Sequence, residues 1–119
     1  MDIKHFDITQ PPGPRMSRCI VRGDMVYICG ITRPDSAKDI KGQTTAVLDA
    51  IQNYLTMAGS NKSQLLTAVF WIKDMKDFND MNSVWNAWVD PNTPPTRACI
   101  RAEMTRPETL IEIMVTAYK

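Results

Sequence analysis

Two amphipathic segments, each expected to form a helix, constrain the fold of this chain most strongly. In residues 39–58 apolar side chains recur every three or four positions, the period of an α-helix, and Gly59 stands where a helix-ending glycine is expected. Residues 77–89 repeat the pattern, with Asp77 as the expected N-cap and an apolar stripe of Phe78, Met81, Trp85 and Trp88. Each predicted helix has one apolar face, so each is expected to cover one side of a sheet.

The segments around these helices are typical of β-strands. They are residues 17–22, 25–31, 65–73, 96–104 and 110–118, with a further short candidate at residues 4–8. Gly23-Asp24 is a two-residue turn suited to a hairpin between the first two, and the last two flank a short loop that predicts a second hairpin. The third is apolar on both faces, which is typical of a central strand. The predicted order is β-β-α-β-α-β-β.

This order predicts an α+β fold in which both helices lie on one face of a mixed sheet, because β-α-β crossovers are right-handed. The other face, expected to carry Met114 and Cys99, would then be uncovered. A sheet face that mixes apolar and charged residues is more often an interface than bare surface. We therefore expect a homo-oligomer whose sheets face inward and whose pockets lie between subunits.

The composition indicates a single domain over residues 1–119 and excludes several classes of function. The net charge is +1 and the Lys and Arg residues are scattered, which argues against a nucleic-acid-binding surface. His5 is the only histidine, so neither a Ser-His-Asp triad nor a histidine-rich metal site is expected. The chain has no glycine-rich phosphate-binding motif, and we expect no cofactor.

The cysteines and the N-terminal segment indicate a cytoplasmic protein. Cys19, Cys29 and Cys99 are odd in number and show no CxxC spacing, which favours reduced thiols. Residues 1–10 do not have the pattern of a signal peptide, and no apolar run approaches the roughly 18 residues that cross a bilayer.

The predicted strand at residues 96–104 alternates strictly, with one face formed by Arg97, Cys99, Arg101 and Glu103. A solvated strand face is the simpler interpretation, and a binding surface is the alternative.

Glu112, on the last predicted strand, has apolar neighbours on its own face. Its carboxylate is therefore expected to be partly removed from water, which suits proton transfer near neutral pH. A structural ion pair with Arg101 is an equal alternative. In a hairpin, Glu112 would face Arg101 or Glu103 and lie roughly 13 Å or more from Arg97. The side chains of Arg97 and Glu112 would then converge only partly within one chain, and convergence across a subunit boundary is equally open.

The segment PPTRACIRAEMTRPETLIEIMV, residues 94–115, resembles the C-terminal signature of the reactive intermediate deaminase family, the RidA/YjgF-like proteins. The spacing from Arg97 to Glu112 agrees with the arginine and glutamate of that signature without a gap. Three further segments are similar to family motifs: GPR at 13–15 to a Gly-Pro-Tyr loop, YICGI at 27–31 to a Ser-Gly strand end, and FNDMNSVWNAWV at 78–89 to a Phe-x-x-Val-Asn helix.

The resemblance implies a chorismate-mutase-like α+β fold and a homotrimer with clefts between subunits. It also implies cofactor-independent hydrolysis of enamines and imines, such as 2-aminoacrylate or 2-imino acids, to 2-keto acids and ammonia. By the same resemblance, Arg97 would bind the substrate carboxylate and Glu112 would orient or activate the attacking water. Cys99 and Asn82 would line the cleft, and Gly30 would offer backbone groups.

Two positions depart from the family pattern. Arg15 stands where many relatives have tyrosine, and Cys29 where they have serine. A second arginine would suit a dicarboxylate such as 2-aminomuconate, whereas the simpler interpretation of Arg15 is a solvated loop residue. Both Cys29 and Cys99 are equally consistent with packing roles. A non-catalytic protein that binds small carboxylates remains an alternative function, and RNA cleavage has the least support.

Overall fold

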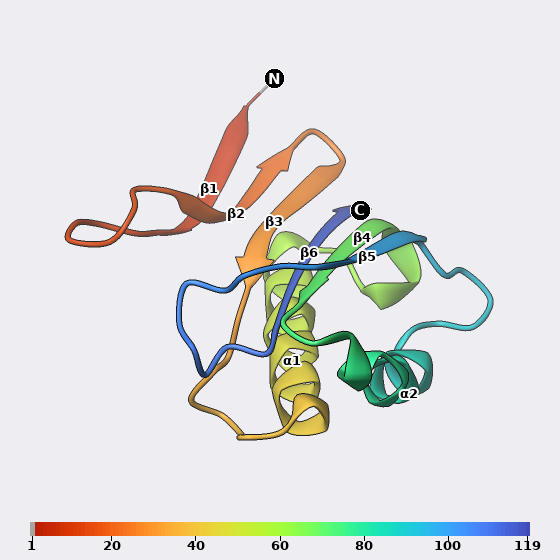
Figure 1. The fold of residues 1–119 in the computed structure, drawn as a ribbon. Coiled ribbons are helices and arrows are strands. Elements are labelled where there is room, and N and C mark those ends of the chain that lie inside the picture. The colour runs from red at the N-terminus through yellow and green to blue at the C-terminus, as the bar shows by residue number, and fades with distance from the viewer. Residues whose placement is uncertain (1) are drawn as a thin grey trace.

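The computed structural model describes residues 2–119 and contains a six-stranded sheet with two helices on one face (Figure 1). The elements are β1 (Ile3–Ile8), β2 (Ser17–Arg22), β3 (Met25–Ile31), α1 (Ile40–Ala58), η1 (Lys62–Gln64), β4 (Leu65–Ile72), η2 (Met75–Asp77), α2 (Phe78–Trp88), β5 (Thr96–Arg101) and β6 (Ile111–Tyr118). The predicted order is confirmed, and the short N-terminal candidate is a full strand at one edge of the sheet.

The long helix α1 is capped at both ends as its sequence predicts. At the start, the Gly42 amide donates to the Asp39 carboxylate over 3.2 Å. At the end, Gly59 adopts the left-handed conformation with φ of 83°. α2 begins after Asp77 as predicted, but the Asp77 side chain makes no capping hydrogen bond. Asp74 instead accepts from the Lys76 amide and caps the short turn η2. Within residues 2–119, neither helix is long and apolar enough to span a bilayer.

The strand order is β1-β2-β3-β6-β4-β5, so the predicted hairpin between the last two strands is wrong. β6 lies between β3 and β4 and is antiparallel to both, while β5 pairs in parallel with the outer side of β4. The connection through α2 returns the chain parallel to β4, which explains why β5 lies at the edge. Glu112 therefore lies opposite Trp71, and its alternative pairing with Arg101 or Glu103 does not occur.

The two faces of the sheet differ sharply in burial. Side chains that point toward the helices form the core, among them Ala68, Phe70, Ile72, Ile111, Ile113 and Val115. The opposite face leaves large apolar side chains exposed: Tyr27 by 46%, Ile100 by 51% and Met114 by 40%. The expectation of one uncovered, partly apolar face is thus confirmed. Cys99, however, pairs with buried Phe70 and packs against the core, so its expected position beside Met114 is wrong.

Gln43 is a buried polar residue on α1 that holds the loop leading into β6. Its amide nitrogen donates to the carbonyls of Ala37 and Glu108, over 3.0 and 2.9 Å, and its amide oxygen accepts from the Leu110 amide over 2.9 Å. The side chain is only 1% exposed, and these bonds offset its removal from water. Gln43 therefore fixes Leu110, which directly precedes β6 and lies two residues before Glu112.

Replacing Gly59 by alanine is expected to lower the free energy of unfolding by about 1 kcal/mol, because a Cβ is unfavourable in the left-handed conformation. Gly13→Ala is a matched control, since no atom lies within 4 Å of the Cβ it would add. Urea unfolding of both variants would check this, and equal stability of Gly59→Ala and the wild type would contradict it.

Candidate functional site

Arg97 lies on the helix-side face of the edge strand β5, above an aromatic surface. Its guanidinium carbon is 4.6 Å from the centre of the Phe70 ring and 5.8 Å from that of Phe78. Cation–π attraction to the rings stabilises the half-buried charge in this position. No side chain within residues 2–119 forms an ion pair or a hydrogen bond with the guanidinium. Its donors are therefore available to a ligand or to another chain.

Two further predicted residues lie on the same side of the sheet as Arg97. Burial raises the pKa of the Cys99 thiol, and the nearby Arg97 charge lowers it only in part. Asn82 lies one helical turn after Phe78, on the same face of α2. The Asn82 side-chain oxygen is buried and accepts no hydrogen bond from any described residue. This oxygen is an acceptor that a ligand or another subunit would satisfy.

Glu112 and Gly30 are in direct contact on neighbouring strands. Gly30 belongs to an irregularity in β3, where the pairing with β6 shifts between Ile28 and Ile31. A Cβ added to Gly30 would lie 2.0 Å from a Glu112 carboxylate oxygen. The half-buried carboxylate therefore rests against bare backbone at Gly30. No described residue forms an ion pair or hydrogen bond with this carboxylate in the structure.

Cys29 precedes Gly30 and is half-buried against the core. Burial raises the pKa of its thiol, the nearby Arg18 lowers it, and the Glu112 carboxylate raises it again. The thiol is therefore protonated near neutral pH, which favours packing and weak hydrogen bonding over nucleophilic attack.

Arg15 lies apart from the other predicted residues. It is exposed in the loop between β1 and β2, which projects on the side of the molecule away from α2 (Figure 1). One guanidinium nitrogen donates to the Gln10 side-chain oxygen over 2.9 Å. Within one chain, Arg15 thus matches the simpler interpretation of a loop residue.

The register places Arg97 and Glu112 on opposite faces of the sheet. Arg97 is aligned with buried Ala68, which faces the helices, whereas Glu112 is aligned with Trp71, which faces away from them. A single chain therefore presents a cationic group and a carboxylate that do not point into one cleft. Among residues 2–119, no group of three or more His, Cys, Asp or Glu is arranged to hold a metal ion.

Comparison with known proteins identifies the family. The family model described as Endoribonuclease L-PSP matches residues 9–119. A RutC family protein of Haemophilus ducreyi is 35% identical over 115 residues, which cover 97% of this chain and 95% of that protein. The chain belongs to the RidA/YjgF-like (RutC) family. The RutC family protein YoaB of Escherichia coli is 33% identical over 103 residues, covering 87% of this chain and 90% of YoaB.

The solved structures extend this likeness to the fold. The crystal structure of a YjgF-family protein of Neisseria meningitidis superposes with a TM-score of 0.92 at 37% identity, covering all of this chain and 96% of that one. The RidA/YjgF-like chain therefore has the chorismate-mutase-like fold that its sequence motifs implied.

The sequence did not predict the contacts of Arg97 with the Phe70 and Phe78 rings. Phe70 comes from β4, where all residues but Thr67 are apolar and Phe70 has no distinguishing neighbour. Phe78 was assigned only to the apolar stripe of α2. The contact between Gly30 and Glu112 was also missed, although both residues were singled out by the family motifs. A glycine within a predicted strand was the available signal, since it marks a bulge or a close approach.

Gly30→Ala is expected to destabilise the wild type by about 1 kcal/mol, because the added methyl group must displace the Glu112 carboxylate. In a Glu112→Ala background the same change is expected to be nearly neutral, since the methyl group then has room. A double-mutant cycle from thermal unfolding measures the difference, and additive effects would show that the two residues do not compete for space.

Both Cys29 and Cys99 are expected to react with iodoacetamide more slowly than a free cysteine at pH 7.5. Their raised pKa values leave a smaller thiolate fraction, so the rates should still be climbing at pH values where a free thiol has reached its plateau. Mass spectrometry of labelled peptides gives each rate. A rate equal to that of free cysteine would contradict the assigned burial.

Proposed function

We propose that this protein is a cofactor-independent hydrolase that converts reactive enamines and imines of 2-amino acids into 2-keto acids and ammonia. The half-buried Arg97 guanidinium, held on aromatic rings without an anionic partner in its own chain, is the main support. A guanidinium fork binds a carboxylate through two parallel hydrogen bonds, and all the proposed substrates carry one.

The working site is proposed to form between subunits of a homotrimer. Arg97 and Glu112 lie on opposite faces of the sheet, so they cannot contact one ligand within a single chain. In the trimer, Arg97 at the β5 edge of one subunit would therefore meet Glu112 on the open face of its neighbour. The exposed apolar side chains of the open face, among them Tyr27, Ile100 and Met114, support association through that face.

The proposed reaction needs little more than orientation and one proton-transfer group. With the carboxylate held by Arg97, water adds to the electrophilic C=N carbon and its proton passes to Glu112. The nitrogen takes up this proton, which gives a neutral carbinolamine. The carbinolamine then collapses: Glu112 transfers the hydroxyl proton to the nitrogen, the C–N bond breaks to release ammonia, and the C=O bond of the keto acid forms. Asn82 is proposed to line the cleft on the same side of the sheet as Arg97.

Three alternative functions can be distinguished from this proposal. Deamination of a dicarboxylate of the 2-aminomuconate type would require Arg15 to reach a site on another subunit, because in its own chain it is bound to Gln10. A binding protein for small carboxylates would use Arg97 without turnover. RNA cleavage has less support, because His5 is the only histidine and its ring nitrogen is paired with the Ser17 hydroxyl at 2.7 Å.

Arg97→Gln is expected to lower kcat/KM for 2-iminopropanoate by about 100-fold or more, because the carboxylate loses its charge-assisted hydrogen bonds. Arg101→Gln is the matched control: it is exposed on the same face of the same strand and should keep nearly full activity. The imine is generated in situ, and its decay and the released ammonia are followed. A wild type that binds the imine acids but matches buffer in every assay would favour the binding protein.

Mixing inactive subunits tests the shared site. Arg97→Gln and Glu112→Gln trimers, unfolded and refolded together in equal amounts, should regain about a quarter of the wild-type activity, because random assembly pairs an intact arginine with an intact glutamate at that frequency. Refolding each variant alone is the control. Failure of the mixed trimers to regain activity, with both variants refolding normally, would place Arg97 and Glu112 outside a common site.

A further inference from the structure

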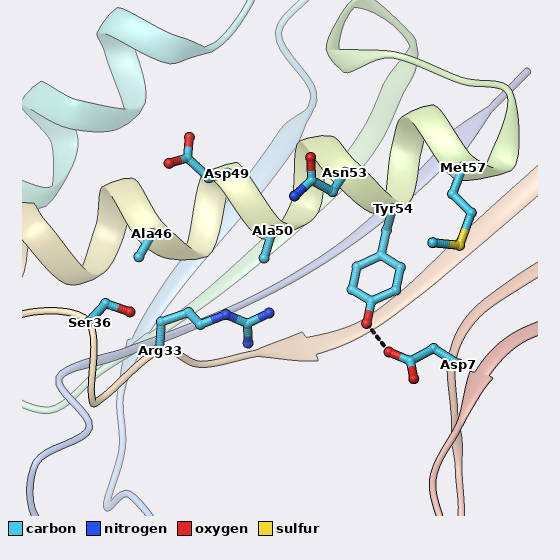
Figure 2. Close-up of a pocket in the computed structure, with 9 residues that line it drawn as sticks. All are labelled: Asp7, Arg33, Ser36, Ala46, Asp49, Ala50, Asn53, Tyr54 and Met57. Carbon is cyan, nitrogen blue, oxygen red and sulfur yellow. Dashed lines mark hydrogen bonds between the residues drawn. The ribbon is translucent and has the colours of Figure 1, made fainter.

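A cavity lies away from Arg97 and Glu112, between α1 and the β1 side of the sheet (Figure 2). It measures about 680 Å³, within the usual range for sites that bind small molecules. Its wall on α1 includes the small side chains Ala46 and Ala50, and its other walls come from Asp7 on β1 and from Arg33 and Ser36 in the loop after β3. None of these residues belongs to the proposed deaminase site.

Arg33 places a positive charge in this cavity, and no described residue of its own chain forms an ion pair with that charge. Figure 2 shows its guanidinium extending below α1 toward the Tyr54 hydroxyl. The side chain is half-buried, and its one hydrogen bond goes to the neighbouring Thr32 carbonyl over 2.7 Å. Among the described residues no carboxylate forms an ion pair with it; nearby Asp35 is bound by Arg106 over 2.9 Å. A partly desolvated cation without a partner is unfavourable, and an anionic ligand would relieve that.

The Tyr54 hydroxyl and the Asp7 carboxylate form a fixed, electrically balanced end of the cavity. Tyr54 donates a hydrogen bond to Asp7, and the Arg18 guanidinium lies 3.4 Å from the same carboxylate. Burial, followed by the bond to Asp7, raises the pKa of Tyr54 to about 12, so the phenol stays protonated. Because Arg18 neutralises Asp7, this end does not compensate Arg33.

The remaining polar lining limits the ligand to a single anionic group. Arg33 is the only cationic side chain that lines the cavity, whereas the Asp7 and Asp49 carboxylates both border it. A second carboxylate on the ligand would be repelled by Asp49, whose charge no described residue pairs with, whereas Asp7 is already neutralised by Arg18. Asn53 and Ser36 offer neutral hydrogen-bonding groups, and Ala46 and Met57 offer apolar contact.

We propose that this cavity is a second ligand site, in which Arg33 binds the carboxylate of a small monocarboxylate such as a 2-amino or 2-keto acid. The guanidinium supplies the charged contact, the Ala46 and Ala50 wall leaves room for the carbon chain, and the Asp49 carboxylate excludes dicarboxylates.

Methyl NMR of the full chain tests this directly, with L-alanine, pyruvate and succinate as probes. We expect saturable shifts of the Ala46, Ala50 and Met57 methyl signals with at least one of the two monocarboxylates, and weaker or no shifts with succinate. Alanine alone would assign the site to amino acids and pyruvate alone to keto acids. Arg33→Gln should weaken binding at least about tenfold, the loss expected for a charge-assisted contact. Ala46→Leu, which keeps a good helix former but fills the cavity, should weaken it as strongly.

Two variants serve as controls. Arg22→Gln removes an exposed arginine of β2 that does not line the cavity and should leave binding unchanged. Arg97→Gln should also leave it unchanged, which separates this site from the proposed deaminase site. The proposal is overturned by the absence of saturable shifts up to about 20 mM ligand, by binding that survives both Arg33→Gln and Ala46→Leu, by loss of binding in Arg97→Gln, or by succinate binding more tightly than both monocarboxylates.

Discussion

The packing of α1 and α2 against one face of the sheet is the constraint on which the rest of the structure depends. Successive side chains of a strand point to opposite faces, so burying Ala68, Phe70 and Ile72 under the helices also decides where each residue of the paired strands points. Arg97 is drawn to the helix side by its alignment with Ala68, and Glu112 is turned away by its alignment with Trp71. A shift of one residue in the β4–β5 pairing would turn Arg97 to the open face. A shift of one residue in the β4–β6 pairing would turn Glu112 inward and the buried side chains of β6 outward.

Because β5 is an edge strand, the charged side chain of Arg97 can lie on the core side of the sheet. β5 has a neighbour on one side only, so Arg97 is half-buried instead of fully enclosed. The rings of Phe70 and Phe78 then replace part of the lost hydration by attraction to the cation. Glu112 occupies the opposite situation, in a central strand but on the open face, where Gly30 leaves space for its carboxylate. Each group is held in place by backbone pairing and packing, and each keeps its hydrogen-bonding capacity.

Local patterns predicted the elements well because helical and strand periods reflect burial directly. The α1 boundaries, with Asp39 and Gly59 at the ends, followed from that logic. Strand pairing was harder to predict, since the short segment at residues 105–109, between the last two predicted strands, suggested a hairpin that the sheet does not contain. The apolar character of β4 on both faces was the better guide, because such a strand needs a neighbour on each side. The roles of Gln43 and of the Phe70 ring depend on contacts between segments distant in sequence, which no local pattern records. The family motifs did identify Gly30, Arg97 and Glu112, but not on which face each lies.

The position of β6 has a consequence for how the chain folds. This strand is the last element in sequence order, yet it joins the β1-β2-β3 half of the sheet to the β4-β5 half. During synthesis, the two halves have no shared strand until residues 111–118 have left the ribosome, so the sheet cannot close stepwise from the N-terminus. The apolar faces of α1 and β4 remain incompletely covered until β6 is available to pair. Completion of the core is therefore expected to be a late folding step, which depends on the pairing of β6 with both halves of the sheet.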